Sequence, residues 1–237
     1  MTYRLVVRPE QIQKNQISLD TQQLHYLRRV LRLKNQDRFI ALDGTGNSWL
    51  AEIVGNSAKI IESLKNTTEL PVSLSLITAL PKGSGYEQVV RCCTELGVSN
   101  FIPVISDRTI LKPSPQKVQR WRKIAIEAAE QSERLIVPHV FEPVKFAVAI
   151  DNFKPTQDKY ICVARGKLPT LWSSLQTAQS DNKSEIIIAT GCEGGWTEDE
   201  VATATASGFC PISLGNSILR AVTAPIVASS IVTAVKL

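Results

Sequence analysis

The sequence predicts an α/β protein in which a small β-barrel-like domain, residues 1–70, precedes a larger α/β domain, residues 71–237. From Val72 onward, apolar β-branched runs alternate with stretches of helical periodicity, which is typical of a parallel sheet with helices on both faces. Before that point, short runs of alternating apolar and polar residues are separated by Gly and Asn turns, which favours β-strands. The pattern changes in the segment NTTELP, so we place the domain boundary near Leu70.

The first domain is predicted to contain strands in the segments YRLVVR and DRFIALDGTGNSWLAEIVGNSAKIIESL, with residues 44–49 forming a hairpin turn. Between these strands, DTQQLHYLRRVLRL has helical spacing, and Asp20 or Thr21 is positioned to cap the helix. Four apolar residues of this helix share one face: Leu24, Leu27, Val30 and Leu31. We therefore expect one amphipathic helix within a β-rich domain.

The second domain is predicted to alternate strands with helices along its whole length. The strands lie in VSLSLITAL, FIPVIS, KYICVA, EIIIAT and CPISL. The helices lie in GYEQVVRCCTELG, PQKVQRWRKIAIEAAEQSE, LPTLWSSLQTA, TEDEVATATAS and the C-terminal segment from about Ile218. Thr197 is expected to cap the helix of TEDEVATATAS, because Glu200 three residues later completes a capping box.

The composition is typical of a soluble globular protein, since 43% of the 237 residues are hydrophobic and 21% are charged. A net charge of +5 suits an anionic partner such as RNA. The five cysteines form no C-x-x-C pair, so we expect reduced thiols and no metal site. The N-terminus lacks the apolar core of a signal peptide, and the apolar C-terminal stretch is too short to span a bilayer. We therefore expect a cytoplasmic protein without a membrane segment.

The segment EIIIATGCEGGWTEDEV places three glycines where a buried strand turns into a helix, and residues 191–195 are called the glycine loop below. Ligands of open α/β sheets bind at the carboxyl ends of strands, and glycine lets a ligand lie against bare backbone. No P-loop or dinucleotide-binding fingerprint is present, and the acidic residues 198–200 would repel a phosphate. The loop therefore favours a ligand of little negative charge, and a tight turn without a ligand is the alternative.

A second segment, ISLGNSILRAVTAP, has the same organisation. A short strand ends at Ser213 and Leu214, the chain turns at Gly215, and a long apolar helix follows. Two strand-end loops of this kind can hold opposite sides of one adenosine-like ligand. Arg220 follows the second loop, where a solvated side chain or an ion pair is the alternative to a role in the site. The apolar helix, residues 218–235, is expected to lie at a dimer interface.

The chain resembles the RsmE family of 16S ribosomal RNA (uracil-N3) methyltransferases in four segments that follow the family's order: TELGV, RWRKIAIEAAEQS, GCEGGWTEDEV and SLGNSILRAVTAP. The resemblance covers nearly the whole chain. It implies a SPOUT-type α/β domain with a deep trefoil knot, preceded by a PUA-like RNA-binding barrel. It also implies a homodimer that uses S-adenosyl-L-methionine to methylate N3 of one uridine in the 16S ribosomal RNA of the small ribosomal subunit.

The resemblance also implies which residues form the site, because in the family two strand-end loops surround the cofactor, chiefly through backbone groups. The matching cofactor-binding positions of this chain are Thr190, Gly191, Cys192, Glu193, Gly194, Gly195, Ser213, Leu214, Gly215, Ile218, Leu219 and Thr223. Glu193 is expected to order the glycine loop by accepting backbone N–H groups. Arg220 is the candidate for a catalytic or base-positioning cation, and no pattern supports a base role for His25 or His139.

Several positions depart from the family's pattern. The usual Arg of the second loop is Ser217, the usual Glu before Thr-Ala is Val222, and the usual Pro of the glycine loop is Cys192. Arg91 and residues 133–136 also differ. Because several of these positions usually carry charge, the exact RNA target stays open. The alternatives are a methyltransferase that acts on another RNA and a non-catalytic RNA-binding relative.

The segment HYLRRVLRLKNQDR concentrates cations on and after the helix of the first domain. Spaced arginines can bind phosphates, and an aromatic residue such as Tyr26 can stack on an unpaired base. Together with the resemblance, this pattern predicts an RNA-binding surface, and a solvated charged face is the alternative. The residues predicted to bind RNA are His25, Arg28, Arg29 and Arg32, with Lys34 and Arg38 nearby.

Overall fold

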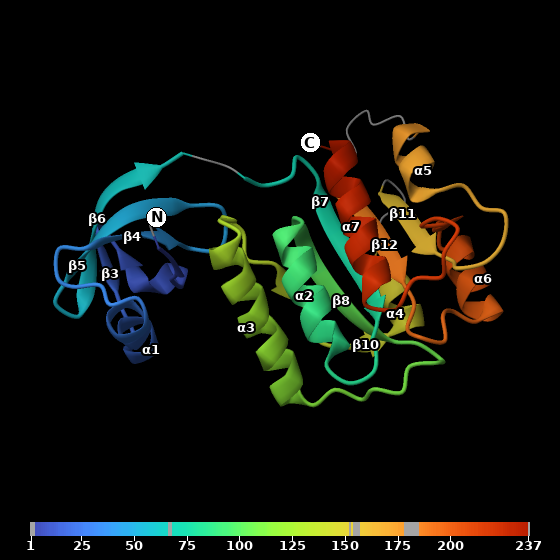
Figure 1. Cartoon of the computed structure of the whole chain (residues 1–237), viewed down its shortest axis with the longest axis horizontal. Coiled ribbons are helices and arrows are strands. Elements are labelled where there is room, and N and C mark those ends of the chain that lie inside the picture. Colours follow the sequence, from blue (N-terminus) through green and yellow to red (C-terminus); the bar gives the residue numbers. More distant parts are fainter. Residues whose placement is uncertain (1–2, 66–67, 152, 154–156, 178–184, 237) are drawn as a thin grey trace. The chain divides into compact units, whose positions relative to one another are not determined.

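A computed structural model of the chain describes residues 3–65, 68–151, 153, 157–177 and 185–236 (Figure 1). Its contacts divide the chain into two compact units. The first unit contains Met1–Glu69 and Ala129–Val137, and the second contains Leu70–Ala128 and Pro138–Leu237. The segment Ala129–Val137 therefore belongs with N-terminal residues far from it in the chain, an association that the linear pattern of the sequence does not reveal.

The first unit is built on a sheet with the strand order β1-β4-β5-β6-β3-β2. Its strands are β1 (Arg4–Val6), β2 (Ile12–Gln13), β3 (Gln16–Ser18), β4 (Arg38–Leu42), β5 (Ser48–Val54) and β6 (Ser57–Leu64). β1 pairs with β4 in parallel, and the remaining pairs are antiparallel. The predicted strands are confirmed, as is the turn between β4 and β5, whereas β2 and β3 are too short to show a clear sequence pattern.

The helical part of the first unit consists of α1 (Thr21–His25) and a π-helical segment, η2 (Tyr26–Val30). The predicted cap is confirmed, because the Asp20 carboxylate accepts the N–H of Gln23 while the Gln23 side chain accepts the N–H of Asp20. The expectation that Val30 joins the buried face is wrong: its side chain is 57% exposed, whereas Leu27 is fully buried. A π turn holds more residues than an α turn, so it changes the direction of the side chains that follow it.

The end of α3 (Pro115–Gln131) and the segment after it are bound to the first unit by ion pairs. Arg134 is 4% exposed, and its guanidinium lies 2.6 Å from the carboxylate of Glu69. The second oxygen of Glu69 accepts hydrogen bonds from the backbone N–H groups of Leu135 and Ile136. Arg4 pairs with Glu133 nearby at 2.7 Å. Residues 133–136, which depart from the family's pattern, thus have a structural role here.

The second unit contains a parallel sheet with the strand order β10-β8-β7-β12-β11-β13, and β9 pairs with β8. Its strands are β7 (Ser73–Ala79), β8 (Val98–Ile105), β9 (His139–Val140), β10 (Val144–Lys145), β11 (Asp158–Cys162), β12 (Glu185–Thr190) and β13 (Cys210–Ile212). The predicted parallel α/β architecture is confirmed. The trefoil knot that the resemblance implies stays a prediction.

Helices cover both faces of this sheet (Figure 1). The helices are α2 (Gly85–Glu95), the part of α3 before Ala129, α4 (Phe146–Ile150), α5 (Leu171–Thr177), α6 (Glu198–Ala206) and α7 (Thr223–Lys236). Leu74 and Leu76 of β7 pack in the core with α2, α3, α5 and α7. Ile77 and Ala79 of the same strand pack with α4 and α6. Strand residues thus alternate between two cores, as buried parallel strands do.

The last helix begins later than the sequence predicts. We expected it to begin near Ile218, but α7 begins at Thr223, and residues 218–222 belong to the preceding loop. The carbonyl of Arg220 accepts the N–H groups of Thr223 and Ala224, which closes the first turn. Pro225 lies in this first turn, where a helix needs no N–H from it.

Within the described residues, no helix is long and apolar enough to cross a membrane. The same residues contain no group of three or more His, Cys, Asp or Glu side chains that could hold a metal ion. All five cysteines lie in described positions, and each of them is a free thiol in this structure.

Candidate active site

A cavity of about 820 Å³ opens in the second unit at the carboxyl ends of β11, β12 and β13. Its walls come from the glycine loop after β12, the second loop after β13, residues 162–165 at the end of β11, and Arg108 after β8. Parallel α/β sheets bind ligands at this edge, and the volume lies within the range of small-molecule sites. The two loops that the sequence singles out therefore meet around one cavity.

The structure explains why the glycine loop lacks side chains at its two ends. A Cβ at Gly191 would lie 3.1 Å from the Cα of Gly195 and 3.2 Å from its carbonyl carbon, so a side chain there would meet backbone. Gly195 has a φ of +68°, which residues with a Cβ adopt at a cost. The Gly195 N–H donates to the carbonyl of Cys192 at 2.9 Å, which closes the turn.

Gly194 leaves room for an arginine that the sequence analysis did not identify. A Cβ at Gly194 would lie 3.0 Å from Cδ and 3.1 Å from Cβ of Arg108. The Nη1 atom of Arg108 donates to the carbonyls of Gly194, at 2.6 Å, and of Trp196, at 3.1 Å. The one available signal was the position of Arg108 shortly after the apolar strand FIPVIS, at the same edge of the sheet as the loop.

Carboxylates anchor the glycine loop on both sides. The Oε1 atom of Glu193 accepts the backbone N–H of Lys82, so Glu193 binds a backbone donor as expected, but one from the loop after β7. The predicted capping box of α6 is confirmed, because the Glu200 carboxylate accepts the N–H of Thr197 at 2.8 Å while the Thr197 hydroxyl accepts the N–H of Glu200. The second Glu200 oxygen accepts the N–H of Asp107 at 2.9 Å.

The second loop is ordered at its tip by Ser213, whose hydroxyl accepts the N–H of Gly215 and donates to its carbonyl. Gly215 has a φ of +127°, and no atom lies within 4 Å of the position of a Cβ. Ile218 lines the cavity although it is 65% exposed. Bare backbone and apolar side chains therefore face the cavity from this side.

Three of the predicted site residues lie outside the lining of the cavity. Thr190 is fully buried in β12, and its hydroxyl donates to the hydroxyl of Thr78 at 3.4 Å. Thr223 is the first residue of α7. The Arg220 side chain is exposed, although its neighbours Leu219 and Ala221 line the cavity. The other predicted cofactor positions all contribute to the lining.

The remaining wall residues suit a ligand that carries both signs of charge. Glu193 and Glu198 line the cavity together with Arg108 and Arg165. Cys162 also lines it, and burial raises the pKa of its thiol to about 12, so this wall stays neutral. The cavity thus offers carboxylates for an ammonium, guanidinium groups for a carboxylate, and uncharged lining residues.

Trp196 adds an aromatic wall with an unused polar atom. Its ring stacks on Phe146 with the centroids 4.3 Å apart. Its Nε1 atom is buried and has no hydrogen-bond partner among the described residues. Buried donors are usually paired, so an unpaired donor in a residue that lines a cavity is consistent with a ligand that accepts a hydrogen bond from it. Together with the open space at the Cβ position of Gly195, these features fit an adenosine-like ligand.

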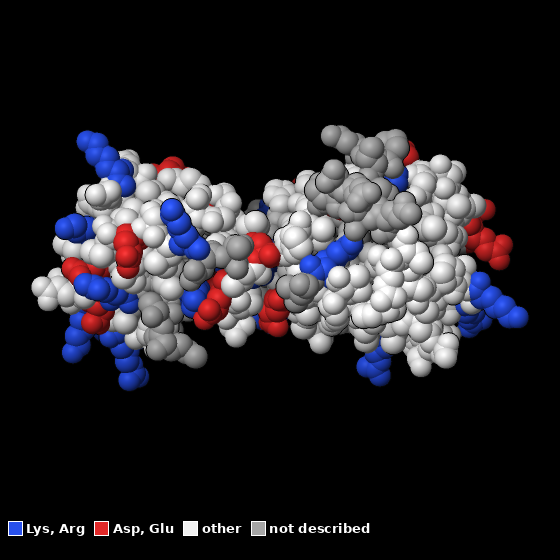
Figure 2. All heavy atoms as spheres, turned by 90° about the horizontal axis from the view of Figure 1, so that it is seen from above, with Lys and Arg blue, Asp and Glu red and all other residues white. Residues whose placement is uncertain are grey.

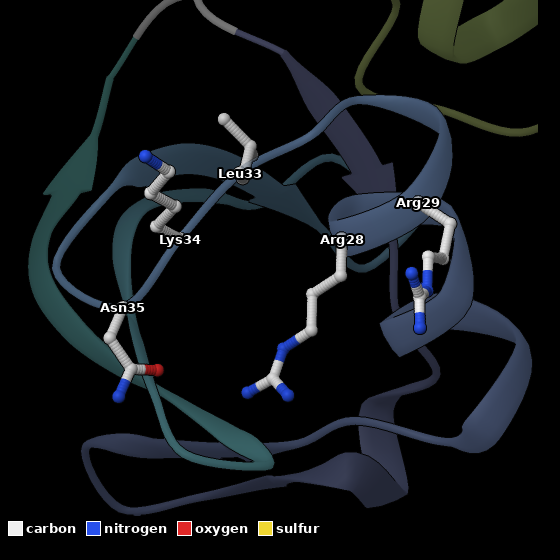
Figure 3. A pocket seen from close by; sticks show the side chains of 5 residues that line it. All are labelled: Arg28, Arg29, Leu33, Lys34 and Asn35. Atoms are coloured by element: carbon white, nitrogen blue, oxygen red, sulfur yellow. The ribbon is translucent and has the colours of Figure 1, made fainter.

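A second, shallow cavity of about 450 Å³ lies in the first unit, and it is called the basic depression below (Figure 3). It is lined by Arg28, Arg29, Leu33, Lys34 and Asn35. Figure 3 shows the two arginines extending from the helical segment, while Lys34 and Asn35 come from the chain that follows it. A guanidinium nitrogen of Arg28 donates to the carbonyl of Gly55, which holds that side chain beside the β5–β6 turn.

The structure brings only two of the four predicted RNA-binding residues to this depression. His25 is exposed at the end of α1, and Arg32 is exposed with a left-handed φ of 59°, but neither lines the depression. Lys34 lines it instead. Figure 2 shows further Lys and Arg side chains on the surface of the first unit, interspersed with acidic ones. His139 packs edge-on against Phe141 and lines neither cavity.

The departures at Ser217 and Val222 have different surroundings. Ser217 is exposed and lines the cavity, so its short side chain leaves space where the family usually has Arg. Val222 packs against the apolar core, and a Cβ at Gly85 would lie 2.8 Å from its Cγ2 atom. A Glu in that conformation would meet an apolar surface, so the change to Val agrees with local packing.

Comparison with known proteins places these features in a family. A family model for the RNA methyltransferase domain matches residues 68–233, and one for the RNA methyltransferase PUA domain matches residues 19–63. Ribosomal RNA small subunit methyltransferase E from Synechocystis sp. is 48% identical over 96% of this chain and 76% of its own length. The enzyme of that name from Bacillus subtilis is 31% identical over 91% of this chain and 89% of its own.

The fold of this chain is also similar to that of a solved structure of the same family. The crystal structure of a ribosomal RNA small subunit methyltransferase E from Neisseria gonorrhoeae, bound to S-adenosyl methionine, matches with a TM-score of 0.87 and 28% sequence identity. The match covers 97% of this chain and 96% of that one. The similarity therefore extends over both units.

Proposed function

This chain belongs to the ribosomal RNA small subunit methyltransferase E family, and we propose that it methylates N3 of a uridine in 16S ribosomal RNA. It is an S-adenosylmethionine-dependent ribosomal RNA methyltransferase with a SPOUT-type α/β domain and an N-terminal PUA-like domain. The observation that carries the proposal is the cavity at the strand ends, because residues of the family's two cofactor motifs both line it.

We infer that the cofactor binds in this cavity between the glycine loop and the second loop. When bound, it supplies a methyl group that is activated on a sulfonium. The backbone of Gly195 and Gly215 can approach the ligand closely because neither residue has a Cβ. The mixed charges of the wall suit its amino-acid part, which carries an ammonium and a carboxylate. Thr190 and Thr223 act indirectly on this proposal, since neither lines the cavity.

The proton on N3 of uridine is an obstacle to the proposed reaction. N3 of uridine is a poor nucleophile while it is protonated, so the protein must remove that proton or stabilise the anion as it forms. A fixed cation beside the base does the latter. Arg220 is our candidate, because its backbone is held by the first turn of α7 and both of its neighbours line the cavity.

The RNA is proposed to bind the first unit through its basic depression and the residues around it. Arg28, Arg29 and Lys34 supply cations that can contact phosphates, and His25 and Arg32 belong to the same short stretch of chain. Tyr26 is 36% exposed on the same segment and can stack on an unpaired base. Binding to the small ribosomal subunit is part of this proposal.

The protein is further proposed to be a homodimer that uses α7. One side of this helix packs in the core through Ala228 and Val232. Ile231 and Val235 also pack against this core but are only half-buried, as is Val227, so some apolar surface remains on the helix. A second copy of the chain would cover that surface. Light scattering at micromolar concentration tests this proposal, and a monomer mass would reject it.

The activity is tested by incubating the protein and S-adenosylmethionine that carries an isotope-labelled methyl group with small ribosomal subunits from a strain that lacks the gene. Digestion and mass spectrometry should locate one 3-methyluridine in the 16S RNA. Free 16S RNA and large subunits serve as parallel substrates. A label on another base or another RNA would reject the proposed target, and a protein that transfers no label to any RNA would reject the proposed reaction.

A further inference from the structure

Arg108 lies in the connection between β8 and α3, and its side chain lines the cavity. Its position in space is fixed by a closed turn, in which the Ser106 N–H donates to the Thr109 hydroxyl and the Thr109 N–H donates to the Ser106 carbonyl. The neighbouring Asp107 N–H donates to Glu200 on α6. The arginine therefore extends from a segment that is already bound to the helix after the glycine loop.

From this base, Arg108 fixes two peptide groups. One is the Gly194–Gly195 peptide, whose carbonyl accepts from Arg108 and whose N–H donates to the Cys192 carbonyl. The other is the Trp196–Thr197 peptide, whose carbonyl accepts from Arg108 and whose N–H donates to Glu200. Since a peptide group is planar, a hydrogen bond at each end fixes its orientation.

The peptide between these two, Gly195–Trp196, is left unbonded. Within the described residues, neither the Gly195 carbonyl nor the Trp196 N–H has a protein partner, and both residues line the cavity. The loop thus presents one free donor and one free acceptor, framed by two peptides that Arg108 holds. Because the loop is already fixed, it loses little conformational entropy when a ligand binds.

We propose that Arg108 is a positioning residue that holds the glycine loop in its ligand-binding conformation. The inference rests on the proposed location of the cofactor in this cavity. Arg108 acts through the two carbonyls, and Gly194 is required because any Cβ there would displace the arginine stem. The competing role is direct contact with the ligand's carboxylate, because Nε and Nη2 of Arg108 have no protein partner among the described residues.

Two ligands separate these roles: S-adenosylhomocysteine and 5′-methylthioadenosine, which lacks the amino-acid part. Titration calorimetry should show that Arg108→Ala weakens both by the same factor, about ten- to a hundredfold, because the loop serves the whole ligand. A loss confined to S-adenosylhomocysteine would overturn the proposal in favour of carboxylate binding, and unchanged affinities would overturn it outright. Lys112→Ala removes an exposed cation from the same connection and should leave both affinities unchanged.

Gly194→Ala provides an independent test, since Gly194 does not have a positive φ and alanine strains no backbone there. This substitution should weaken both ligands in the wild-type background but have no further effect in the Arg108→Ala background. Additive losses would contradict the proposal. Arg108→Lys keeps the charge, but the shorter lysine side chain does not reach the position of Nη1, which donates to both carbonyls, so this variant should bind less tightly than wild type and serves if Arg108→Ala fails to fold.

Chemical rescue completes the test. Methylguanidinium in the buffer should restore part of the affinity of folded Arg108→Ala and have no effect on wild type, a response that general destabilisation would not produce. Absence of rescue together with a lowered midpoint of thermal unfolding would reduce Arg108 to a stabilising residue and overturn the proposal. If the wild-type protein binds neither ligand, the proposed cofactor site itself is wrong, and the two failures are thereby distinguished.

Discussion

The glycine loop of the second unit is formed mainly by backbone groups, whereas the basic depression of the first unit is formed mainly by side chains. In the glycine loop, Gly191, Gly194 and Gly195 have no side chains, and carbonyls, N–H groups and three charged anchors fix the backbone. In the basic depression, long side chains supply the surface, and Arg28 donates a hydrogen bond to the carbonyl of Gly55.

The comparison teaches that the two ligands should respond to different substitutions. A site made of fixed backbone fails when its conformation changes, even by one methyl group. A site made of flexible cations loses affinity gradually as charges are removed, and it depends on salt. Substitutions in one region should therefore leave the other ligand's affinity unchanged.

The largest effect is expected from Gly191→Ala. The new Cβ would lie 3.1 Å from the Cα of Gly195 and 3.4 Å from the N atom of Trp196, and backbone atoms cannot move aside as a side chain can. Affinity for S-adenosylhomocysteine should fall by about a hundredfold, the equivalent of overpacking a tightly packed site. Affinity for 16S RNA should not change. A folded variant with wild-type cofactor affinity would show that the glycine loop is not the cofactor site.

The next largest effect concerns the basic segment. The triple variant Arg28/Arg29/Arg32→Ala should lower RNA affinity about tenfold at moderate salt and flatten the dependence of log affinity on log salt by about one unit per lost phosphate contact. Arg32 lies outside the depression, so restoring Arg32 alone should recover the least affinity. Filter binding over a series of salt concentrations measures both quantities.

The matched control for this variant is Arg28/Arg29/Arg32→Lys, which should keep the salt slope because it keeps the charges. Affinity for S-adenosylhomocysteine should be the same in wild type and both triple variants. If the alanine variant has the wild-type salt slope, the cations of this segment form an ordinary solvated surface, and the RNA is bound elsewhere.

The two regions also differ in how far the sequence predicts them. The strand, turn and capped helix around the glycine loop follow from local patterns, because EIIIAT, the glycines and the Thr197–Glu200 box are neighbours in the chain. Their arrangement opposite Ser213 follows from parallel topology, which the alternation of strands and helices predicts. Both strand-end loops line one cavity, and their role in cofactor binding stays a prediction.

The features that the sequence analysis did not find depend on residues far apart in the chain. Arg108 meets the glycine loop only because β8 and β12 are both neighbours of β7, and no local pattern marks that arginine. The π turn that exposes Val30 is hidden because its residues continue the helical spacing. The late start of α7 is hidden for the same reason, since residues 218–222 are as apolar as the helix that follows.

A moderate effect is expected from Glu200→Ala, which removes the acceptor of the Thr197 and Asp107 N–H groups. The free energy of unfolding should fall by about 1–3 kcal/mol, the range for a lost cap with buried donors left unpaired. Affinity for S-adenosylhomocysteine should fall only a few-fold, because Arg108 still holds the loop. Chemical denaturation and calorimetry measure the two effects, and a loss of affinity as large as that of Gly191→Ala would show that the cap, not the glycines, dominates.

The smallest effect separates a neutral cavity wall from a charged one. Burial raises the pKa of the Cys162 thiol from 9.0 to about 12, so in the folded state the thiol stays protonated when the unfolded thiol begins to ionise. The unfolded state then binds fewer protons, and stability should fall as pH rises above 9, by at most about 1.4 kcal/mol per pH unit for one thiol.

Cys93 and Tyr160, whose pKa values are also raised to about 12, contribute in the same direction. Cys162→Ala should therefore make the fall in stability between pH 9 and 11 less steep, by the contribution of one titrating group. Denaturant titrations at several pH values measure the slope, and equal slopes in wild type and Cys162→Ala would show that this wall of the cavity is solvated enough to carry a thiolate.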